Sequence, residues 1–593
     1  MELVSELQQL LHAGLVSILG SEVDAAGVVV QPTRNEFEGD YTLVVFPWAK
    51  QARKSPETLA AELGEWAQQH SEWIAGYNVV RGFLNLGLTD ACWAEAIRAV
   101  DATDGFGLPT PGSSGKTVMV EYSSPNTNKP LHLGHIRNIL LGHSVSQLLK
   151  AAGHTVVQAN LVNDRGVHIC KSMLAWQRFG EGETPQTSGL KGDHLIGKYY
   201  VRFDQEYRRE VAELMASRGI SEEEAKAQTP ILLAAHEMLR AWEAHDPEVV
   251  ALWERMNGWV YEGFDATYAR LGVAFDKVYY ESQTYLLGKK IVMDGLARGI
   301  LFQKDDGSIW CDLTADGLDQ KLLLRSDGTS VYMTQDLGTA VQRAEAYHLD
   351  SMVYVVGNEQ DYHFQVLRLI LKKLGYTWAE RLHHLSYGMV FLPSGKMKSR
   401  EGTVVDADDL IDSLDSIARQ TAESLGKQQA ISHDEADEVY HQVGLGALKY
   451  FMLKVDPTKN MTFNPEESIE FNGNTGPFIQ YTHARACSVL RQVEEPGAAR
   501  GPVALSRHER TVARRVCEYT AVVLAAAEQF SPALVANYAY ELAREFNQFY
   551  HECPIARESD VQLRGLRIAL TRCTAAVLKS ALGLLGIWAP ERM

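Results

Sequence analysis

Cysteine is scarce in this chain, and its few cysteines show no pairing pattern. The seven cysteines are spread over 593 residues without a Cys-x-x-Cys pair. This spacing argues against a disulfide framework and against a structural zinc site. It favours a reducing compartment, so we expect a cytoplasmic protein without a structural metal.

Long apolar runs are also missing. No run approaches the ~18 residues that a membrane-spanning helix requires, although apolar residues make up 46% of the chain. The segment Met1–Gly20 reads as an amphipathic helix, and it lacks the basic start and apolar centre of a secretory signal. The sequence therefore predicts no membrane partner.

Positive charge is in deficit. The chain has 57 basic and 75 acidic residues, a formal net charge of −18. Phosphate binding needs local positive charge, so this balance sits awkwardly with a nucleic-acid partner. It does not exclude one, because a folded surface can separate a basic stripe from an acidic remainder, and RNA is also recognised by shape and stacking.

The chain is long enough for about four domains at ~150 residues each. An α+β unit at 1–112 precedes a linker (PTPGSSG, 109–115), and a nucleotide-binding α/β domain follows at 116–400, with a helical insertion at about 166–300. A linking helical region at 401–470 leads to a helical domain at 471–593. In the first unit we expect helices at Leu3–Leu19 and Pro56–His70, and strands at Val28–Val30, Tyr41–Phe46 and Asn78–Leu86.

The α/β domain opens with alternating elements. A strand at Thr117–Tyr122, a helix at Gly134–Ala152 and a strand at Thr155–Leu161 form a βαβ unit, which predicts a parallel sheet. The later half repeats the alternation, with a hairpin turn at Ser326–Gly328, strands at Ser351–Val356 and His384–Leu392, and a helix at Phe364–Leu374.

The strongest motif lies between the first strand and the helix after it, at Pro125–His135 (PNTNKPLHLGH). Open α/β sheets bind ligands at this edge, and a helix N-terminus attracts phosphate. His132 and His135 lie on one face of the first turn and can donate to phosphate oxygens, while Gly134 lets a planar ring approach the backbone. The alternatives are metal ligation, although no cysteine or third histidine lies nearby, and an ordinary helix start.

A second motif, Gly395–Arg400 (GKMKSR), places three cations in five residues after an apolar strand. Such a loop can clamp a leaving pyrophosphate. Taken alone it is also compatible with a solvated basic turn.

The two motifs together, about 260 residues apart, resemble the paired signatures of class I aminoacyl-tRNA synthetases. The family's second motif is Lys-Met-Ser-Lys-Ser, and its fourth position is Ser399 here; Lys129 is a candidate substitute, as in arginyl enzymes with a degenerate second motif. The resemblance implies a Rossmann-type parallel-sheet catalytic domain that uses ATP with Mg²⁺. It implies catalytic roles for His132, His135, Lys129, Lys396 and Lys398, and ATP contacts from Pro125, Asn126, His132, Gly134, His135, Met389, Val390, Lys396, Met397 and Ser399.

Two further stretches, Glu121–Asn126 and Tyr332–Asp336, resemble the arginyl branch of that family. A guanidinium needs carboxylates for forked hydrogen bonds and gains from an aromatic face. The resemblance implies that Glu121 and Asp336 hold the guanidinium and Tyr332 stacks on it. Ser123 and Asn126 would hold the amino-acid end, and Gln360 would be a further ligand. Taken singly, Glu121 is also compatible with a surface strand end, and Tyr332 with packing.

The C-terminal stretches Gly476–Arg485 and Tyr540–Asn547 resemble the family's helical anticodon-binding domain. The implied tRNA contacts are Tyr481, Arg485, Arg544 and Asn547, and the alternative is an ordinary helix-bundle core. Phe37–Tyr41 and Arg81–Asn85 resemble the extra N-terminal domain that contacts the tRNA elbow.

The resemblance therefore implies a monomeric arginine–tRNA ligase with L-arginine and tRNA(Arg) as partners, in which tRNA binds before arginine is activated. Two alternatives stay open. A class I synthetase for another amino acid would call for zinc ligands if that amino acid were cysteine, or for a long editing insertion if it were a large aliphatic one. A non-catalytic RNA-binding relative would be expected to lose the phosphate-contacting residues, which are present here.

Overall fold

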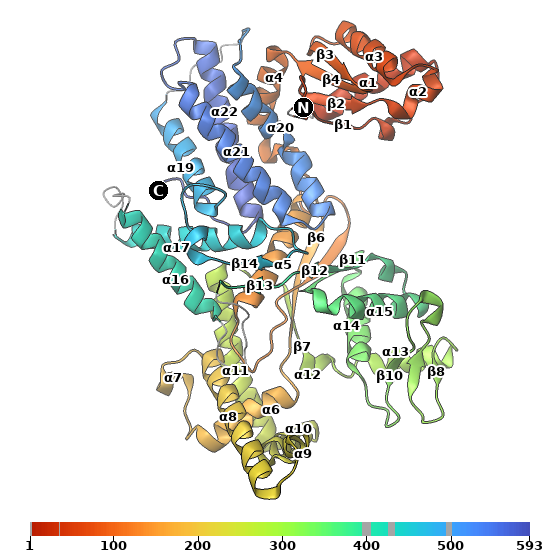
Figure 1. Ribbon diagram of the computed structural model, residues 1–593, viewed down its shortest axis with the longest axis vertical. Helices are drawn as coiled ribbons and strands as arrows, with labels where there is room; N and C mark the ends of the chain where they lie inside the picture. The colour runs from red at the N-terminus through yellow and green to blue at the C-terminus, as the bar shows by residue number, and fades with distance from the viewer. Residues whose placement is uncertain (1–2, 35, 394–404, 425–432, 494–500) are drawn as a thin grey trace.

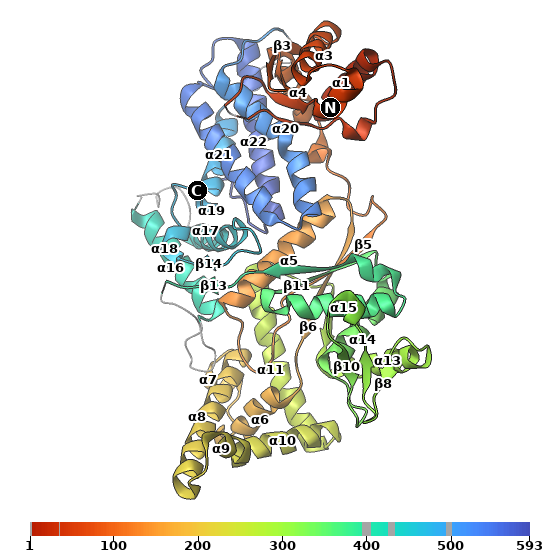
Figure 2. The same cartoon turned by 45° about the vertical axis from the view of Figure 1, so that its right-hand side comes forward.

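The computed structural model describes residues 3–34, 36–393, 405–424, 433–493 and 501–593. The molecule is elongated, and its N-terminal domain lies at the end opposite a long helical insertion, with a central sheet between them (Figure 1). The turned view in Figure 2 shows the same order of parts. No helix in the described ranges is both long and apolar enough to cross a membrane.

The N-terminal domain packs helices on a four-stranded antiparallel sheet of order β1-β2-β4-β3. The predicted helices Leu3–Leu19 and Pro56–His70 are confirmed to the residue. The predicted single strand Asn78–Leu86 is wrong, because Arg81 (φ 49°) and Gly82 (φ 80°) turn the chain there into a hairpin. The elements are α1 (Leu3–Leu19), β1 (Val30–Pro32), β2 (Tyr41–Val44), α2 (Phe46–Ala52), α3 (Pro56–His70), β3 (Ile74–Val80), β4 (Phe83–Leu88) and α4 (Asp90–Asp101).

The central sheet has five parallel strands in the order β12-β11-β5-β6-β7, which confirms the predicted parallel sheet. Along β5, Val118 and Val120 are buried on one face while Met119 is buried in a separate core on the other, as strand alternation requires. The bounds are β5 (Thr117–Glu121), α5 (Leu133–Ala151), β6 (Thr155–Val162), β7 (Lys277–Tyr280), β11 (Ser351–Gly357), α15 (Asp361–Lys373), β12 (Leu382–Tyr387) and β13 (Val390–Phe391).

The long helices of the insertion after β6 end at Leu271. The chain then returns as β7 and pairs with β6, so the stretch expected to be helical to about residue 300 also contains a strand of the central sheet. The long helices of the insertion form the lower arm of the molecule (Figure 1). They are α6 (Val167–Phe179), α7 (Pro185–Ser188), α8 (Gly192–Arg218), α9 (Glu222–Gln228), α10 (Pro230–Glu243) and α11 (Pro247–Leu271).

A small α+β unit between β7 and β11 covers one side of the sheet. The expected turn at Ser326–Gly328 is confirmed, since Gly328 has φ 76° and the amide of Arg325 donates to Thr329 O at 2.9 Å. The short antiparallel sheet of this unit was not predicted. Its elements are α12 (Glu281–Thr284), α13 (Gly288–Ala297), β8 (Phe302–Gln303), β9 (Ile309–Cys311), β10 (Lys321–Leu324) and α14 (Tyr332–Tyr347).

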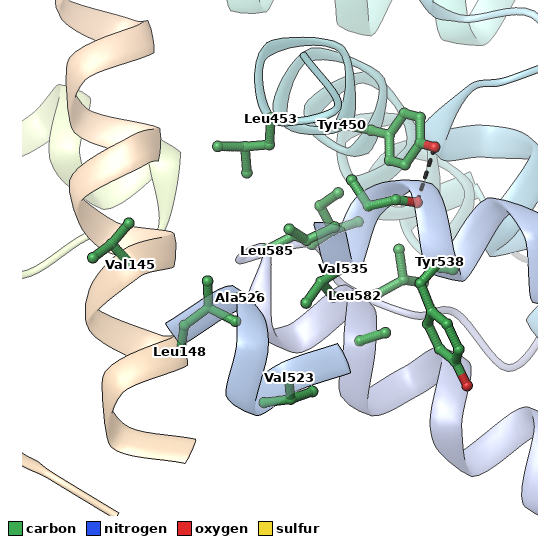
Figure 3. Close-up of a cluster of buried hydrophobic side chains, with 14 of the residues drawn as sticks. Val145, Leu148, Tyr450, Leu453, Val523, Ala526, Val535, Tyr538, Leu582 and Leu585 are labelled. Atoms are coloured by element: carbon green, nitrogen blue, oxygen red, sulfur yellow. Dashed lines mark hydrogen bonds between the residues drawn. The ribbon is translucent and has the colours of Figure 1, made fainter. Parts of the chain in front are cut away.

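The C-terminal part is a helix bundle that packs directly on α5. Figure 3 shows Val145 and Leu148 of α5 facing side chains from the bundle, and it shows the hydroxyl of Tyr450, which donates to Ala536 O at 3.1 Å. The bundle therefore fixes the position of the helix that begins at the His-x-Gly-His motif. Its elements are α16 (Ala407–Ser424), α17 (His433–Leu453), β14 (Met461–Thr462), α18 (Pro465–Ser468), α19 (Gly476–Gln492), α20 (Arg507–Glu528), α21 (Pro532–Glu552) and α22 (Val561–Leu584).

Candidate active site

The site lies where the strand order of the central sheet reverses. From β5 the chain proceeds through β6 and β7 to one edge, and later adds β11 and β12 on the other side of β5. The carboxyl ends of the strands beside such a reversal form the usual ligand crevice of α/β sheets. The loop from β5 to α5, which carries the histidine motif, begins at this edge.

The first residues after β5 have an uncommon backbone. Ser123 and Ser124 have φ values of 74° and 46°, in the left-handed region that non-glycine residues rarely adopt. Buried amides hold them there: Asn138 accepts the Ser123 amide at 2.5 Å, and Asn160 accepts the Ser124 amide at 3.1 Å. Strain held in this way is common where a loop is shaped for a ligand.

The rings of His132 and His135 lie together at the start of α5, with centroids 3.9 Å apart and planes tilted by 38°. The Nδ1 atom of His132 accepts the Gly134 amide at 3.2 Å, and Nδ1 of His135 accepts the His132 amide at 3.1 Å. Because each Nδ1 is an acceptor, the proton of each neutral ring lies on Nε2. Both side chains can therefore donate one hydrogen bond to an anion at the helix N-terminus.

Burial keeps both rings neutral. It lowers the pKa of His132 to about 4, with Lys129 adding to the fall and Asp406 opposing it. Burial and the charges of His132 and Lys129 hold the pKa of His135 well below its usual value. Gly134 packs closely beside them, since an added Cβ would lie 3.1 Å from the His132 ring.

Lys129 lies between two cavities. A deep cavity of about 520 Å³ is lined by Asn126, Lys129, Glu281 and Tyr332, among others. A side cavity of about 250 Å³ is lined by Lys129 and His132 together with residues of α8. Burial lowers the pKa of Lys129, and within the described ranges no carboxylate pairs with it. Its ammonium is thus available to an anionic ligand.

Glu281 is the one acidic residue among the described residues that line the deep cavity, and Arg165 and Arg325 line it as well. Burial raises the pKa of Glu281 to about 7; Arg165 opposes the rise, and the charges of Asp164 and Asp336 add to it. Asp336 is close enough for its charge to affect the pKa of Glu281. The carboxylate of Asp336 lies 2.6 Å from His363 Nε2. Tyr332, the first residue of α14, is 74% exposed, so its ring is free to stack on a ligand.

Sequence reasoning missed Glu281. It directly follows β7, at the same sheet edge as the histidine motif. The available signal was the short run Val278–Tyr280, made of β-branched and aromatic residues that favour strands, which lay inside a segment expected to be helical. A carboxylate at the end of a parallel strand would have been recognised as a candidate ligand if that strand had been predicted.

Glu121 is placed differently from the expectation. Its carboxylate is buried and forms an ion pair with Arg343, a buried guanidinium of the chain itself. Glu121 is not among the described residues that line the deep cavity. Burial raises its pKa and Arg343 opposes the rise. The structure places Glu121 against Arg343 and outside the lining of the deep cavity, and the pair lies close enough to Asp336 for the charges to interact.

The other expected ligands are distributed unevenly. Asn126 lines the deep cavity, and the adjoining backbone of Pro125 accepts the amide of Asn163 at 2.9 Å. The Ser123 hydroxyl contacts that of Tyr268 at 2.7 Å, and Gln360 is exposed and does not line the cavity. Met389 is 49% exposed and Val390 is buried in β13. Lys396, Met397, Lys398 and Ser399 lie outside the described residues.

The expected tRNA-contacting residues lie on two adjacent helices of the bundle. On α19, the guanidinium of Arg485 lies 4.8 Å from the Tyr481 ring centroid and 5.4 Å from that of Tyr550 on α21. It also donates to Asn547 of α21. Arg544 instead pairs with Glu541 and Glu545 of its own helix. The structure thus brings together three of the four predicted residues and adds Tyr550.

Comparisons with known proteins agree with this geometry. Three family models match: the catalytic domain of class I tRNA synthetases (R) at residues 108–465, the arginyl tRNA synthetase N terminal domain at 5–88, and the DALR anticodon binding domain at 479–593. The fold and the His-x-Gly-His motif at the start of α5 together define a class I aminoacyl-tRNA synthetase.

Relatives narrow this class further. Arginine–tRNA ligases of Bacteroides fragilis and Porphyromonas gingivalis are 55% and 52% identical to the chain, and each comparison covers 100% of both proteins. The arginyl-tRNA synthetase structure of Thermus thermophilus matches with a TM-score of 0.80 at 26% identity, over 100% of both chains. The chain belongs to the arginyl-tRNA synthetase family.

Proposed function

We propose that this chain joins L-arginine to tRNA(Arg) in two steps, with ATP converted to AMP and pyrophosphate. One observation carries the proposal: the deep cavity is lined both by Lys129, just before the histidine motif, and by Glu281, whose carboxyl group interacts with the charge of Asp336. A ligand with a guanidinium at one end and a reacting carboxylate at the other matches a cavity that offers both a cation and a carboxyl group. Membership of the arginyl family and full-length identity to arginine–tRNA ligases support it.

In the first step, a carboxylate oxygen of arginine attacks the α-phosphorus of ATP. The bond from that phosphorus to the bridging oxygen breaks, and pyrophosphate leaves. His132 and His135 donate from Nε2 to phosphate oxygens as negative charge develops, and Lys129 neutralises part of that charge. We propose contributions from Lys396 and Lys398 as well, on the basis of the family motif.

Magnesium supplies further neutralisation of the phosphates when it is bound to the nucleotide. The described residues at the phosphate end are a lysine and two neutral histidines, a donor set that suits phosphate oxygens. We therefore propose that Mg²⁺ enters with ATP. The chain's own residues position the triphosphate at the N-terminus of α5.

Selection of arginine rests on the carboxyl groups of Glu281 and Asp336, which can accept forked hydrogen bonds, and on exposed Tyr332, which offers a face for stacking. Arginine would add a cationic partner to those already present, Arg165 near Glu281 and His363 at Asp336, and a neutral amino acid would not. Asn126, which lines the same cavity as Lys129, is a candidate to hold the amino-acid end.

In the second step, a ribose hydroxyl of the terminal adenosine of tRNA attacks the arginyl carbonyl, and AMP leaves. The cluster of Tyr481, Arg485, Asn547 and Tyr550 is the proposed anchor for anticodon bases, because aromatic rings and a guanidinium plane can stack on unpaired bases. This anchor would hold the tRNA while its other end reaches the deep cavity.

The deciding experiment is tRNA charging with each of the twenty amino acids, with and without His135→Ala. We expect arginine alone to be attached, and the variant to lose about 10²- to 10³-fold in rate, as when an oxyanion donor is removed. Charging of a neutral amino acid instead would contradict the assignment of Glu281 and Asp336, and tRNA binding without any charging would favour a non-catalytic relative. Measuring ATP–pyrophosphate exchange with and without tRNA tests whether tRNA must bind first.

We further propose a cytoplasmic, monomeric enzyme. All seven cysteines are free, as is usual in a reducing compartment. The monomeric state stays a prediction, which light scattering of the purified protein checks.

A further inference from the structure

The segment 405–407 is paired with the histidine motif. The Leu133 amide donates to Val405 O at 3.2 Å, and the Ala407 amide donates to Leu131 O at 3.0 Å. Between them, His132 and Asp406 form an antiparallel bridge. The position of His132, the N-cap of α5, therefore depends on where the backbone of Asp406 is held.

The side chain of Asp406 points to the helical insertion. Its carboxylate lies 3.1 Å from Nε2 of His194 on α8, and the other carboxylate oxygen accepts the Asp408 amide at the start of α16 at 2.8 Å. His194 also lies 3.5 Å from the Asp408 carboxylate. One imidazole thus links the insertion to a segment that is hydrogen-bonded to the histidine motif.

Two more cations of the insertion complete the cluster. Lys191 pairs with Asp408 and, at 3.2 Å, with the fully buried Asp193, while Arg270 of α11 contacts Asp408 at 3.2 Å. The side chains of Asp406 and Asp408 are only 12% and 14% exposed, so their charges are poorly screened by water. Hydrogen bonds to the two carboxylates raise the pKa of His194 to about 10, so it stays charged at neutral pH.

A bound metal is the competing interpretation. Within the described ranges, ligand atoms of His194, Asp406 and Asp408 lie within 4.8 Å of one another. However, Lys191, Arg270 and the Thr267 hydroxyl already contact the oxygens of the Asp408 carboxylate. The contacts therefore favour an ion network.

Packing alone does not fix the motif against the insertion. The helix α8 contacts the loop at Gly197, where an added Cβ would lie 2.8 Å from Cδ of Pro130. Beside this contact the side cavity of about 250 Å³ separates His132 from α8, with His194 and Asp406 on its wall. Across that space, His194 of α8 is connected to His132 through Asp406 and does not contact the His132 side chain directly.

We propose that His194 is a positioning residue for arginine activation, which holds His132 in register through Asp406. This rests on the proposed function, since His132 is the group that contacts phosphate there. His194 does not itself line the deep cavity, so the arginine end of the site is independent of it.

The test measures ATP–pyrophosphate exchange with saturating tRNA for His194→Ala and for Asp406→Asn, which keeps a helix-capping side chain. We expect both to lower kcat about 10- to 100-fold, the usual consequence of displacing a catalytic group by about 1 Å, with KM for arginine changed less than about twofold. His194→Arg, which keeps a cation beside the two carboxylates, is expected to recover most of the loss. The control is Arg208→Ala, which breaks an exposed pair on the same helix and is expected to leave both constants unchanged.

A double-mutant cycle with His132→Ala separates positioning from general destabilisation. If His194 acts through His132, then His194→Ala costs little further rate once the His132 ring is gone, because residues that act as a unit are non-additive. Equal losses in both backgrounds, or full activity of His194→Ala, would overturn the proposal. So would a zinc-dependent rise in melting temperature seen in the wild type and absent from His194→Ala.

Failure of the proposed function is distinguishable from failure of this inference. An unmodified enzyme without arginine-dependent exchange contradicts the function itself. An active enzyme whose variants behave additively contradicts only the role of His194. A melting temperature for each variant shows whether loss of activity reflects loss of the fold.

Discussion

Replacing Glu281 by glutamine removes one negative charge from the deep cavity and preserves the size of the side chain. The proposed contact is a charge-assisted hydrogen bond to the arginine guanidinium, and such bonds contribute about 1.5–3 kcal/mol. At 1.36 kcal/mol per tenfold change, KM for arginine should rise about 10- to 150-fold. The turnover number should change less, because the proposed contact is to the guanidinium and not to the reacting carboxylate or the phosphates.

The pH dependence gives a second, sharper readout of the same group. Burial raises the pKa of Glu281 to about 7. The free enzyme therefore carries the neutral acid below pH 7 and the carboxylate above it. The ratio kcat/KM for arginine should fall towards tenfold per pH unit below about 7 and level off above it. The pKa of His132, at about 4, keeps that ring out of this window.

The assay is arginine-dependent ATP–pyrophosphate exchange with tRNA present, measured from pH 5.5 to 8.5. In the Glu281→Gln enzyme the break near pH 7 should disappear. The matched control is Glu262→Gln, an exposed residue on α11 that should keep the wild-type profile. An unchanged KM for arginine in Glu281→Gln, or the same break in both variants, would refute the reasoning.

Four other changes test separate parts of the structure. Lys129→Met should lower kcat for arginine activation about 10²-fold with little change in melting temperature, because its ammonium neutralises phosphate charge; an unchanged kcat would show that other cations suffice. His132→Ala should lower the same rate by about 10²- to 10³-fold, measured in single-turnover adenylate formation. Arg485→Gln should raise KM for tRNA in aminoacylation and leave KM for arginine alone; equal effects on both would contradict an anticodon role. Gly142→Ala should destabilise the fold by about 1–3 kcal/mol in urea unfolding, since the new Cβ would lie 2.2 Å from the buried Tyr122 ring.

The sequence predicted best the elements whose signals are local. The helix Pro56–His70 is marked by a Ser55 cap and a proline in its first turn, and the structure gives these bounds. The histidine motif was found because strand, loop and helix follow one another within one short stretch, and α5 begins one residue before the predicted start. Such features need no knowledge of distant contacts.

Contacts between distant segments escaped prediction. Glu121 and Arg343 are far apart in the chain, and no periodic pattern identifies a buried guanidinium as its partner. Strand β7 has only four residues and follows a long helical segment, so its pairing with β6, and with it the place of Glu281, depended on tertiary structure. The chemistry of a guanidinium indicates that its site needs carboxylates, but the sequence could not show which carboxylate lines the cavity.

The acidic composition was an awkward fit for a tRNA partner, and the structure shows why the net charge was a weak guide. Arg34 of the N-terminal domain and Arg507, Arg510 and Arg514 of α20 surround one interdomain cavity of about 330 Å³, where Asp40 is the only acidic residue among the described residues of the lining. Electrostatic fields decay over about 8 Å at physiological salt, so a polyanion responds to such local clusters. The formal net charge of −18 is a sum over the whole surface, whereas one partner contacts only part of that surface. Charge separation between faces therefore makes an acidic chain compatible with a polyanionic substrate.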